Sequence, residues 1–216
     1  MRKLILFFVL IISFVIFLVG NAFSPDQLND KTFLDKRDSL NYELVTIGNL
    51  VWMQRNLNYE TPNSKCYNNE KSNCNLYGRM YPRNEAIQAC PDGWRLATTV
   101  DWKKTIALVK GKEKIPALLA KNVWQDSDSN KVITTDTLGL SILPGGRTVS
   151  GDTESNGNFI RLGQNSSYWT IDPKHPEVNF HVHIDVSNLE IHDHKWMDHK
   201  IAHFYIRCVC DDSTKN

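Results

Sequence analysis

The stretch that decides the fold is residues 83–102, which read RNEAIQACPDGWRLATTVDW. Its first part, Arg83–Cys90, carries apolar residues at helical spacing, and Pro91-Asp92-Gly93 then ends the predicted helix. Thr98 and Asp101, three residues apart, form a capping box that predicts the start of a second helix. The stretch therefore predicts two short helices joined by a tight turn.

The segment after this stretch continues the helical pattern over a short distance. Trp102, Ile106 and Val109 lie on one face of the second predicted helix, and Gly111 ends it. Ile115–Lys121 is predicted to form a third short helix.

Strands are predicted on both sides of the helices. Before them, Tyr42–Ile47 and Leu50–Met53 flank Gly48-Asn49 and predict a hairpin. After them, turn signals separate several short strands, and Asn179–Val186 and Phe204–Val209 alternate as strands do. The order of a hairpin, two helices and a run of strands predicts an α+β fold with an antiparallel sheet.

Residues 1–22 have the pattern of a secretory signal. Arg2 and Lys3 precede an apolar run that extends from Leu4 to Val19, and small residues follow at the positions that signal peptidase reads. We expect cleavage after Ala22 and export of the rest of the chain.

An uncleaved membrane anchor is the alternative interpretation of this leader. Leu4–Phe23 nearly reaches the roughly 20 apolar residues that a spanning helix needs. Residues 23–41 are polar and without period, so they are predicted to be a linker, and with an uncleaved leader they would form a stalk.

The charge balance excludes the strongly basic class of nucleic-acid-binding proteins. Residues 1–22 hold two basic residues and no acidic one, so cleavage leaves 23 basic against 24 acidic residues. About 190 residues suit one domain with a sizeable core. We therefore expect one globular domain at residues 42–211, a short tail at 212–216 and no nucleic-acid partner.

The chain has five cysteines, which are Cys66, Cys74, Cys90, Cys208 and Cys210. In an exported chain, paired cysteines are expected to form disulfides, and here one must be left over. Cys66 and Cys74 lie in the predicted loop Asn56–Asn75. A bridge between them would stabilise this loop by about 2.5 kcal/mol through chain entropy.

Seven short motifs run through the chain. They are Trp52-Met53 with Asn56-Leu57-Asn58-Tyr59, Cys66-Tyr67-Asn68-Asn69, Cys74 with Tyr77-Gly78-Arg79-Met80-Tyr81, Ala89-Cys90-Pro91-Asp92-Gly93-Trp94-Arg95-Leu96 with Trp102, Leu143-Pro144-Gly145-Gly146-Arg147, Tyr168-Trp169-Thr170, and Ile206-Arg207-Cys208-Val209. In this order and spacing they resemble the Fibrobacter succinogenes major paralogous domain, a family of bacterial exported proteins. The resemblance covers residues 42–211.

That family is similar to proteins of the C-type-lectin-like fold, so the resemblance implies a disulfide-bonded α+β scaffold of this type with antiparallel sheets and two main helices. In such folds a cysteine that ends the first helix bonds to a cysteine on the last strand. The resemblance thus implies a Cys90–Cys208 disulfide, with Cys66–Cys74 as the local bridge. Cys210 is then a buried inert thiol, or it replaces Cys208 as the partner of Cys90.

Histidines cluster in the C-terminal part of the chain, where the family usually carries Tyr and small polar residues. His181 and His183 would share one face of a strand, and His192 and His194 could add ligands for zinc, copper or nickel. The alternative, which we expect, is a polar outer face of an edge hairpin with no resident metal.

A second candidate metal segment is Asp126-Ser127-Asp128-Ser129-Asn130, which begins like a calcium-binding loop. Its sixth position is Lys131 instead of Gly, and its twelfth is Thr137 instead of Glu. We therefore expect a solvated turn without calcium.

Two of the six tryptophans are candidates for ligand contact. Trp124 and Trp196 lie in loop-like segments, where an indole could stack on a sugar ring or a partner side chain. Trp94 and Trp102 are expected in the core instead.

The sequence shows no catalytic arrangement of a nucleophile with a base. We therefore expect a non-catalytic surface or binding module whose loops bind a surface polysaccharide or a protein. It would be secreted, periplasmic or on the cell surface, and residues 1–22 would be its only membrane contact if they are not cleaved.

Two other functions stay open at this point. One is an enzyme similar to the sulfatase-modifying oxidases of the same broad fold, which need a reactive cysteine pair. The other is a protein that binds metal through its histidines.

Overall fold

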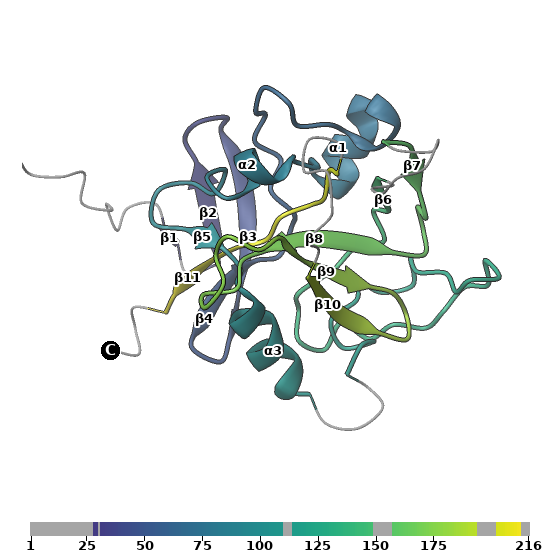
Figure 1. Cartoon of the computed structure of the whole chain (residues 1–216). Coiled ribbons are helices and arrows are strands. Elements are labelled where there is room, and N and C mark those ends of the chain that lie inside the picture. The colour runs from purple at the N-terminus through teal and green to yellow at the C-terminus, as the bar shows by residue number, and fades with distance from the viewer. Residues whose placement is uncertain (1–27, 30, 110–113, 149–156, 194–201, 213–216) are drawn as a thin grey trace, which may run out of the picture.

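The computed structural model describes residues 28–29, 31–109, 114–148, 157–193 and 202–212 (Figure 1). The predicted signal or anchor at residues 1–22 and most of the tail lie outside the described residues. In the part that is described, no helix is both long and apolar enough to cross a membrane.

The described strands form three antiparallel sheets. The largest has the order β1-β2-β3-β4-β11-β5, with β1 Leu28–Asn29, β2 Thr32–Asp35, β3 Leu40–Ile47, β4 Leu50–Met53, β11 Cys208–Asp211 and β5 Arg95–Leu96. The second has the order β10-β9-β8, with β10 Leu189–Asp193, β9 Phe180–Ile184 and β8 Ser166–Thr170. The third pairs β6 Arg147–Thr148 with β7 Phe159–Ile160. The last strand of the chain thus lies between β4 and β5, which joins both ends of the domain in one sheet.

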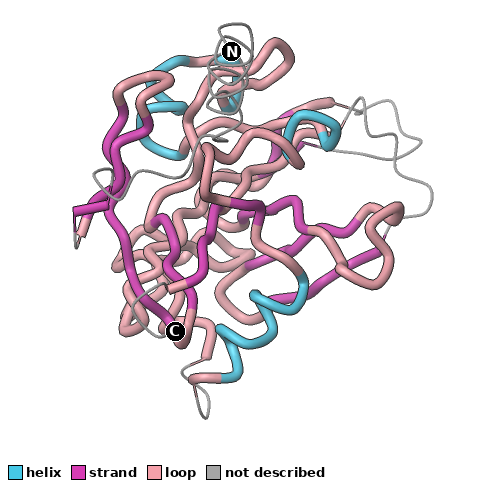
Figure 2. The backbone as a smooth tube through the Cα atoms, turned by 90° about the vertical axis from the view of Figure 1, so that its left-hand side faces the viewer, coloured by secondary structure: helices cyan, strands magenta, loops and turns pink. Residues whose placement is uncertain are grey.

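Within the described residues, four short helical segments accompany the sheets, and loops make up most of the rest (Figure 2). They are η3 Tyr67–Asn69, α1 Lys71–Tyr77, α2 Arg83–Ala86 and α3 Thr99–Ala107. The fold is therefore sheet-rich with few helices, and its antiparallel sheets agree with the prediction.

The N-terminus of α3 confirms the predicted capping box. The Thr98 hydroxyl accepts a hydrogen bond from the Asp101 backbone N–H, and the Asp101 carboxylate accepts one from the Thr98 N–H at 2.8 Å. Two backbone donors that the helix itself cannot satisfy are thereby paired.

The helix predicted for Arg83–Cys90 is shorter than expected, since α2 ends at Ala86. Pro91 disfavours helical backbone at the residue before it. In addition, the Ala89 carbonyl accepts a hydrogen bond from Arg37 Nη1 at 2.9 Å. Cys90 therefore lies beyond the helix and does not end it.

The third predicted helix, Ile115–Lys121, is wrong, because this segment forms turns. The carbonyls of Pro116, Ala117 and Leu118 accept hydrogen bonds from backbone N–H groups within residues 135–142. Distant partners have replaced the local bonds that a helix would need.

The predicted hairpin around Gly48-Asn49 is confirmed, with Ile47 paired to Leu50 in β3 and β4. All four residues of β4 are buried. Because side chains alternate along a strand, Leu50 and Trp52 pack into one core cluster while Val51 and Met53 pack into another.

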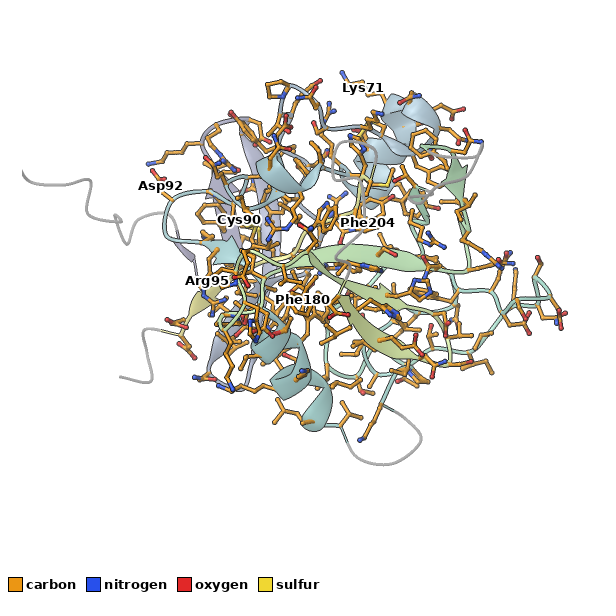
Figure 3. All side chains as sticks on the ribbon, viewed as in Figure 1. Lys71, Cys90, Asp92, Arg95, Phe180 and Phe204 are labelled. Atoms are coloured by element: carbon orange, nitrogen blue, oxygen red, sulfur yellow. A yellow bond between two sulfur atoms is a disulfide. The ribbon has the colours of Figure 1, made fainter. Side chains whose placement is uncertain are left out.

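Aromatic pairs form the centres of both clusters. In the first, Trp52 lies 5.0 Å from Trp102 between ring centroids. In the second, Trp169 lies 4.6 Å from Phe204, which is surrounded by interior side chains (Figure 3). Trp94 belongs to the second cluster, so the expected core positions of Trp94 and Trp102 are confirmed.

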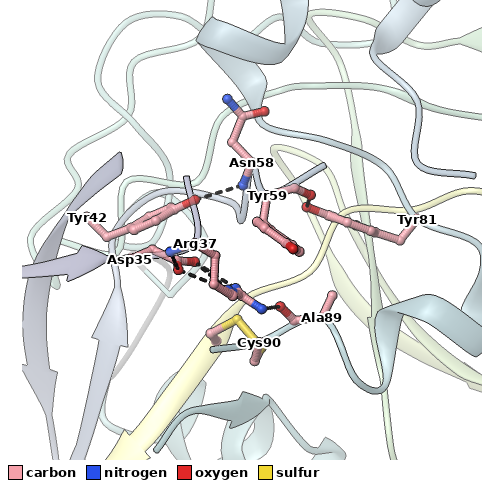
Figure 4. Close-up of a disulfide and its surroundings, with 9 residues drawn as sticks. Asp35, Arg37, Tyr42, Asn58, Tyr59, Tyr81, Ala89 and Cys90 are labelled. Carbon is pink, nitrogen blue, oxygen red and sulfur yellow. Dashed lines mark hydrogen bonds and ion pairs between the residues drawn. A yellow bond between two sulfur atoms is a disulfide. The ribbon is translucent and has the colours of Figure 1, made fainter. Parts of the chain in front are cut away.

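The predicted linker at residues 23–41 is contradicted from Leu28 onward, because β1 at Leu28–Asn29 already pairs with β2. Residues 32–35 form β2, in which Phe33 is 1% exposed and lies 5.1 Å from Trp94. Arg37 then binds the buried Asp35 carboxylate at 2.6 Å and stacks over the Tyr59 ring at 3.9 Å (Figure 4). The four-residue strand was too short to show its period in the sequence.

Both disulfides implied by the family resemblance are present, and the predicted loop Asn56–Asn75 contains η3 and the start of α1. Cys66 bonds to Cys74, and Cys90 bonds to Cys208 across 118 residues. The longer bridge lies beside the Arg37 network (Figure 4). Closing so long a loop stabilises the domain by about 5 kcal/mol in the chain-entropy model.

We predict that Phe33→Ala lowers the free energy of unfolding by about 3–5 kcal/mol, because it empties a buried site against Trp94. The neighbouring Leu34, 39% exposed, provides the control, and Leu34→Ala should cost less than about 1 kcal/mol. Urea unfolding of the oxidised protein measures both. Equal small effects would show that β2 is not part of the core.

Candidate functional site

A polar cleft of about 440 Å³ lies where four loop-rich segments meet. Its described lining comes from residues 125–127, from Arg147 in β6, from residues 161–165 and from residues 183–188. The Gln125 N–H donates to the Gly163 carbonyl at 2.8 Å, which ties two of these segments together. A further hollow of about 460 Å³ beside His203 contains no arginine.

The motif Pro144-Gly145-Gly146-Arg147 positions Arg147 in this cleft. A Cβ on Gly145 would lie 2.6 Å from the Tyr205 hydroxyl oxygen, so only glycine fits there. Gly146 has a φ of +74°, and a Cβ on it would lie 2.5 Å from the Tyr67 ring. Because both glycines lack a side chain, the loop can lie directly on the core, and this places Arg147 at the start of β6.

The Arg147 guanidinium is half-buried and poorly paired. Its Nη1 makes a long 3.4 Å hydrogen bond to the Thr148 carbonyl, and its buried Nε has no hydrogen-bond partner among the described atoms. Burial, and then the positive charge of Arg161, lower the pKa of Arg147. Two guanidinium groups thus face one partly desolvated cleft.

Arg161 lies on the exposed side of the cleft, immediately after β7. Its backbone has a φ of 64°, which is uncommon for a residue with a side chain. Its Nη1 donates to Gln164 Oε1 at 3.3 Å, and the Gln164 amide in turn donates to the Ser129 hydroxyl at 3.3 Å. The rim on this side is therefore a connected set of polar side chains.

His183 lies in the cleft as a neutral imidazole. The Asn165 amide nitrogen donates to the Ile184 carbonyl at 2.9 Å, which fixes the orientation of the amide, and the same nitrogen lies 2.8 Å from His183 Nε2. The amide nitrogen also lies 3.2 Å from His183 Nδ1, and because it can only donate, one of the two ring nitrogens must be an acceptor. Burial, followed by the charge of Arg147, lowers the pKa of His183.

The acidic side chains of the rim are engaged in their own turns. One Asp126 oxygen accepts from the N–H groups of Asp128 and Asn130, both at 2.9 Å. One Asp185 oxygen accepts from the N–H groups of Ser187 and Asn188. The carboxylate of the segment that begins like a calcium-binding loop thus closes a turn, as expected, and these hydrogen bonds lower the pKa of Asp126.

The predicted histidine cluster is only partly assembled among the described residues. His181 in β9 pairs with His192 in β10, and their rings are stacked 5.2 Å apart between centroids. His183 is 6.2 Å from His192, with the rings nearly perpendicular. His194 lies outside the described residues. Within the described ranges, no group of three or more His, Cys, Asp or Glu side chains is arranged to hold a metal ion.

The tryptophan expected at the surface is buried. Trp124 is fully buried, and its indole N–H donates to the Ile142 carbonyl at 2.8 Å. Trp124 packs in the first core cluster, so the prediction that it contacts a ligand is wrong. Trp196, the other candidate, lies outside the described residues.

The free cysteine is Cys210 in β11, as the family resemblance implied. Burial raises the pKa of its thiol to about 11. At neutral pH the thiolate is therefore scarce, and this thiol is a poor nucleophile.

The cleft is formed by segments that the sequence pattern does not connect. The Asp126 turn, the Gly-Gly-Arg motif and His183 lie far apart in the sequence, and the structure brings them together. Arg161 and Gln164 carried no signal, because neither belongs to a motif or a periodic segment. Only the tertiary arrangement of the loops reveals them.

We predict that the free energy of unfolding of His183→Gln, taken relative to the wild type, rises as the pH falls. The folded pKa of His183 lies below its unfolded value of about 6.5, so the unfolded state takes up the proton first and acidification costs the wild-type protein stability. The free energy of unfolding of the variant minus that of the wild type should increase as the pH falls below about 7 and level off below the folded pKa.

Chemical denaturation across this pH range measures the difference. His175→Gln changes an exposed histidine outside the cleft and provides the matched control. A difference that stays constant or shrinks on acidification would contradict the neutral His183.

Comparison with known proteins matches most of the chain to one family. The model of the Fibrobacter succinogenes major domain matches residues 45–210, from within β3 to within β11. No curated protein and no solved structure matches the chain. The match includes both disulfides and the Gly-Gly-Arg motif of the cleft. The chain therefore belongs to the Fibrobacter succinogenes major domain family.

Proposed function

We propose that the chain is an exported, non-catalytic binding module and that the polar cleft is its ligand site. Two disulfides indicate an oxidising compartment outside the cytoplasm. The signal pattern at residues 1–22 supports export to the periplasm, the cell surface or the medium. The partner is a surface polysaccharide or a protein.

The scaffold that we propose is C-type-lectin-like. Two features support this: the last strand, β11, lies inside the sheet that the first strands build, and a long-range disulfide joins it to Cys90. Such a scaffold holds its loops on a rigid core, an arrangement that suits recognition by loops.

The observation that carries the proposal is the construction of the cleft. Its four segments are held by main-chain hydrogen bonds and by glycines that fit against the core, so its shape exists before any ligand arrives. Its volume of about 440 Å³ falls in the range of small-ligand sites, roughly 300–1,000 Å³. Preformed sites bind more tightly because the protein loses less conformational freedom when the ligand binds.

The cysteines favour binding over the alternative of a cysteine-dependent oxidase. Four of the five are already joined in disulfides, and the thiol of Cys210 has a pKa raised to about 11. An oxidase of that kind needs a reactive cysteine pair. Among the described residues, no group of three or more His, Cys, Asp or Glu side chains is arranged to hold a metal ion, so no geometry there favours the metal-binding alternative.

A screen of the exported protein against immobilised glycans and cell-surface extracts will identify ligands, and one substitution assigns them to the cleft. Ser187 is exposed and lines the cleft, so Ser187→Trp should fill it and weaken binding at least about tenfold. Ser72 is exposed on α1 outside the cleft, so Ser72→Trp is the matched control. A ligand that binds both variants equally would move the site elsewhere.

The number and reactivity of free thiols distinguish a binding module from a cysteine-dependent enzyme. Oxidised, denatured protein should react with one equivalent of a thiol reagent, through Cys210. In the native protein at pH 8 only on the order of 0.1% of this thiol is ionised, so the reaction should be slow. Two or more free thiols, or a fast native reaction, would favour the enzyme.

A further inference from the structure

Among the described arginines, the pair in the cleft lacks a partner of opposite charge. Among the other described arginines, Arg37, Arg79 and Arg95 form ion pairs with carboxylates. Arg55, Arg83 and Arg207 instead donate to main-chain carbonyls. Arg147 and Arg161 have no carboxylate within ion-pair distance in the described part of the chain. Both line the same cleft.

Burial makes this arrangement costly without a ligand. Like charges in a partly desolvated site repel each other, and the lowered pKa of Arg147 reflects both its burial and the charge of Arg161. An oxyanion between the two guanidinium groups would remove that repulsion.

The acidic side chains that line the cleft do not take this role. Asp126 and Asp185 each accept two backbone N–H bonds within their own turns. They lie farther than 4 Å from both guanidinium groups, since neither forms an ion pair. These hydrogen bonds hold both carboxylates within their own turns, and neither carboxylate pairs with a guanidinium group of the cleft.

The rest of the described lining suits a ligand rich in hydroxyl groups. It consists mainly of amides and hydroxyls that both donate and accept hydrogen bonds, which are Gln125, Ser127, Gln164, Asn165, Ser187 and Asn188. No aromatic ring apart from the His183 imidazole is among these lining residues, so stacking on a neutral sugar face has little support here. Recognition must then come from charge and hydrogen bonds.

We propose that the cleft binds the oxyanion of an acidic saccharide, with Arg147 and Arg161 contacting the anionic group and the surrounding amides contacting ring hydroxyls. This inference rests on the proposed binding function and specifies its ligand class. The anion is a uronate carboxylate or a sulfate ester, which share the acceptor geometry that a guanidinium recognises.

The test uses the exported protein and four probes of stated chemistry. They are a uronic-acid oligosaccharide, the same oligosaccharide methyl-esterified to make it neutral, a sulfated neutral oligosaccharide, and polyglutamate. The uronate or the sulfated probe should bind, the esterified probe should bind at least about tenfold more weakly, and the affinity should fall as salt is raised. Whichever of the two anionic saccharides binds more tightly identifies the source of the anion.

Substitutions connect the binding to the two arginines. Arg161→Gln and Arg147→Gln should each weaken binding of the anionic saccharide at least about tenfold. Arg147→Lys should weaken it less, because the positive charge is kept. It should still bind more weakly than the wild type, because the bidentate geometry is lost. Arg161 is exposed, so its variant keeps the fold, and an unchanged melting temperature verifies this. Arg55→Gln, an exposed arginine outside the cleft, is the control.

The outcomes separate this inference from the proposed function. Three outcomes overturn the acidic-saccharide inference: binding of the esterified probe as tight as that of the better anionic saccharide, unchanged binding by Arg161→Gln, or tighter binding of polyglutamate. If no probe binds but the screen yields a ligand that Ser187→Trp loses, the inference fails and the binding function stands. If neither the probes nor the screen gives a saturable ligand, both fail.

Discussion

The interaction on which the rest of the domain depends is the buried guanidinium of Arg207. Its Nε donates to Asn56 Oδ1 at 2.7 Å, and its Nη1 donates to the carbonyls of Met53 at 2.8 Å and Leu140 at 2.9 Å. Its Nη2 donates to the Ser141 carbonyl at 3.3 Å. Burial lowers the pKa of this group, and the carbonyl dipoles replace the water that it has lost. One side chain thus joins the end of β4, the long central loop and the last strand.

The neighbours of Arg207 explain why motifs far apart in the sequence occur together. The Asn56 amide that accepts from Arg207 also donates to the Tyr77 carbonyl at 2.8 Å. Gly78 follows with a φ of +81°, and a Cβ there would lie 2.7 Å from the Asn56 Cβ. On the other side, Cys208 is adjacent to Arg207 in the chain and is held by its disulfide to Cys90. Changes in any one of these motifs would disturb the others.

Signals that act over a few residues were readable from the sequence, whereas those that depend on distant partners were not. The turn at Gly48-Asn49 and the cap at Thr98 are local, and both occur as predicted. Ile115–Lys121 had a helical pattern, but its carbonyls bond to a segment 20 residues away. Trp124 looked exposed because nothing nearby in sequence covers it. The disulfide pairing came from family resemblance, since five cysteines alone permit several pairings. The cleft could not be predicted from the sequence, because its two arginines come together only when the loops that carry them pack in the folded domain.

The pairing of β1 and β2 into the sheet also limits how far the domain can stand from a membrane. The stalk expected at residues 23–41 would have given long and flexible reach, yet from Leu28 onward this segment belongs to the folded domain. Between Ala22 and Leu28 there are only five residues, which span at most about 18 Å when fully extended. With an uncleaved leader, the domain would therefore be held close against the lipid headgroups. The tether would then add little reach beyond the dimensions of the domain itself, whereas cleavage after Ala22 would remove this restriction altogether.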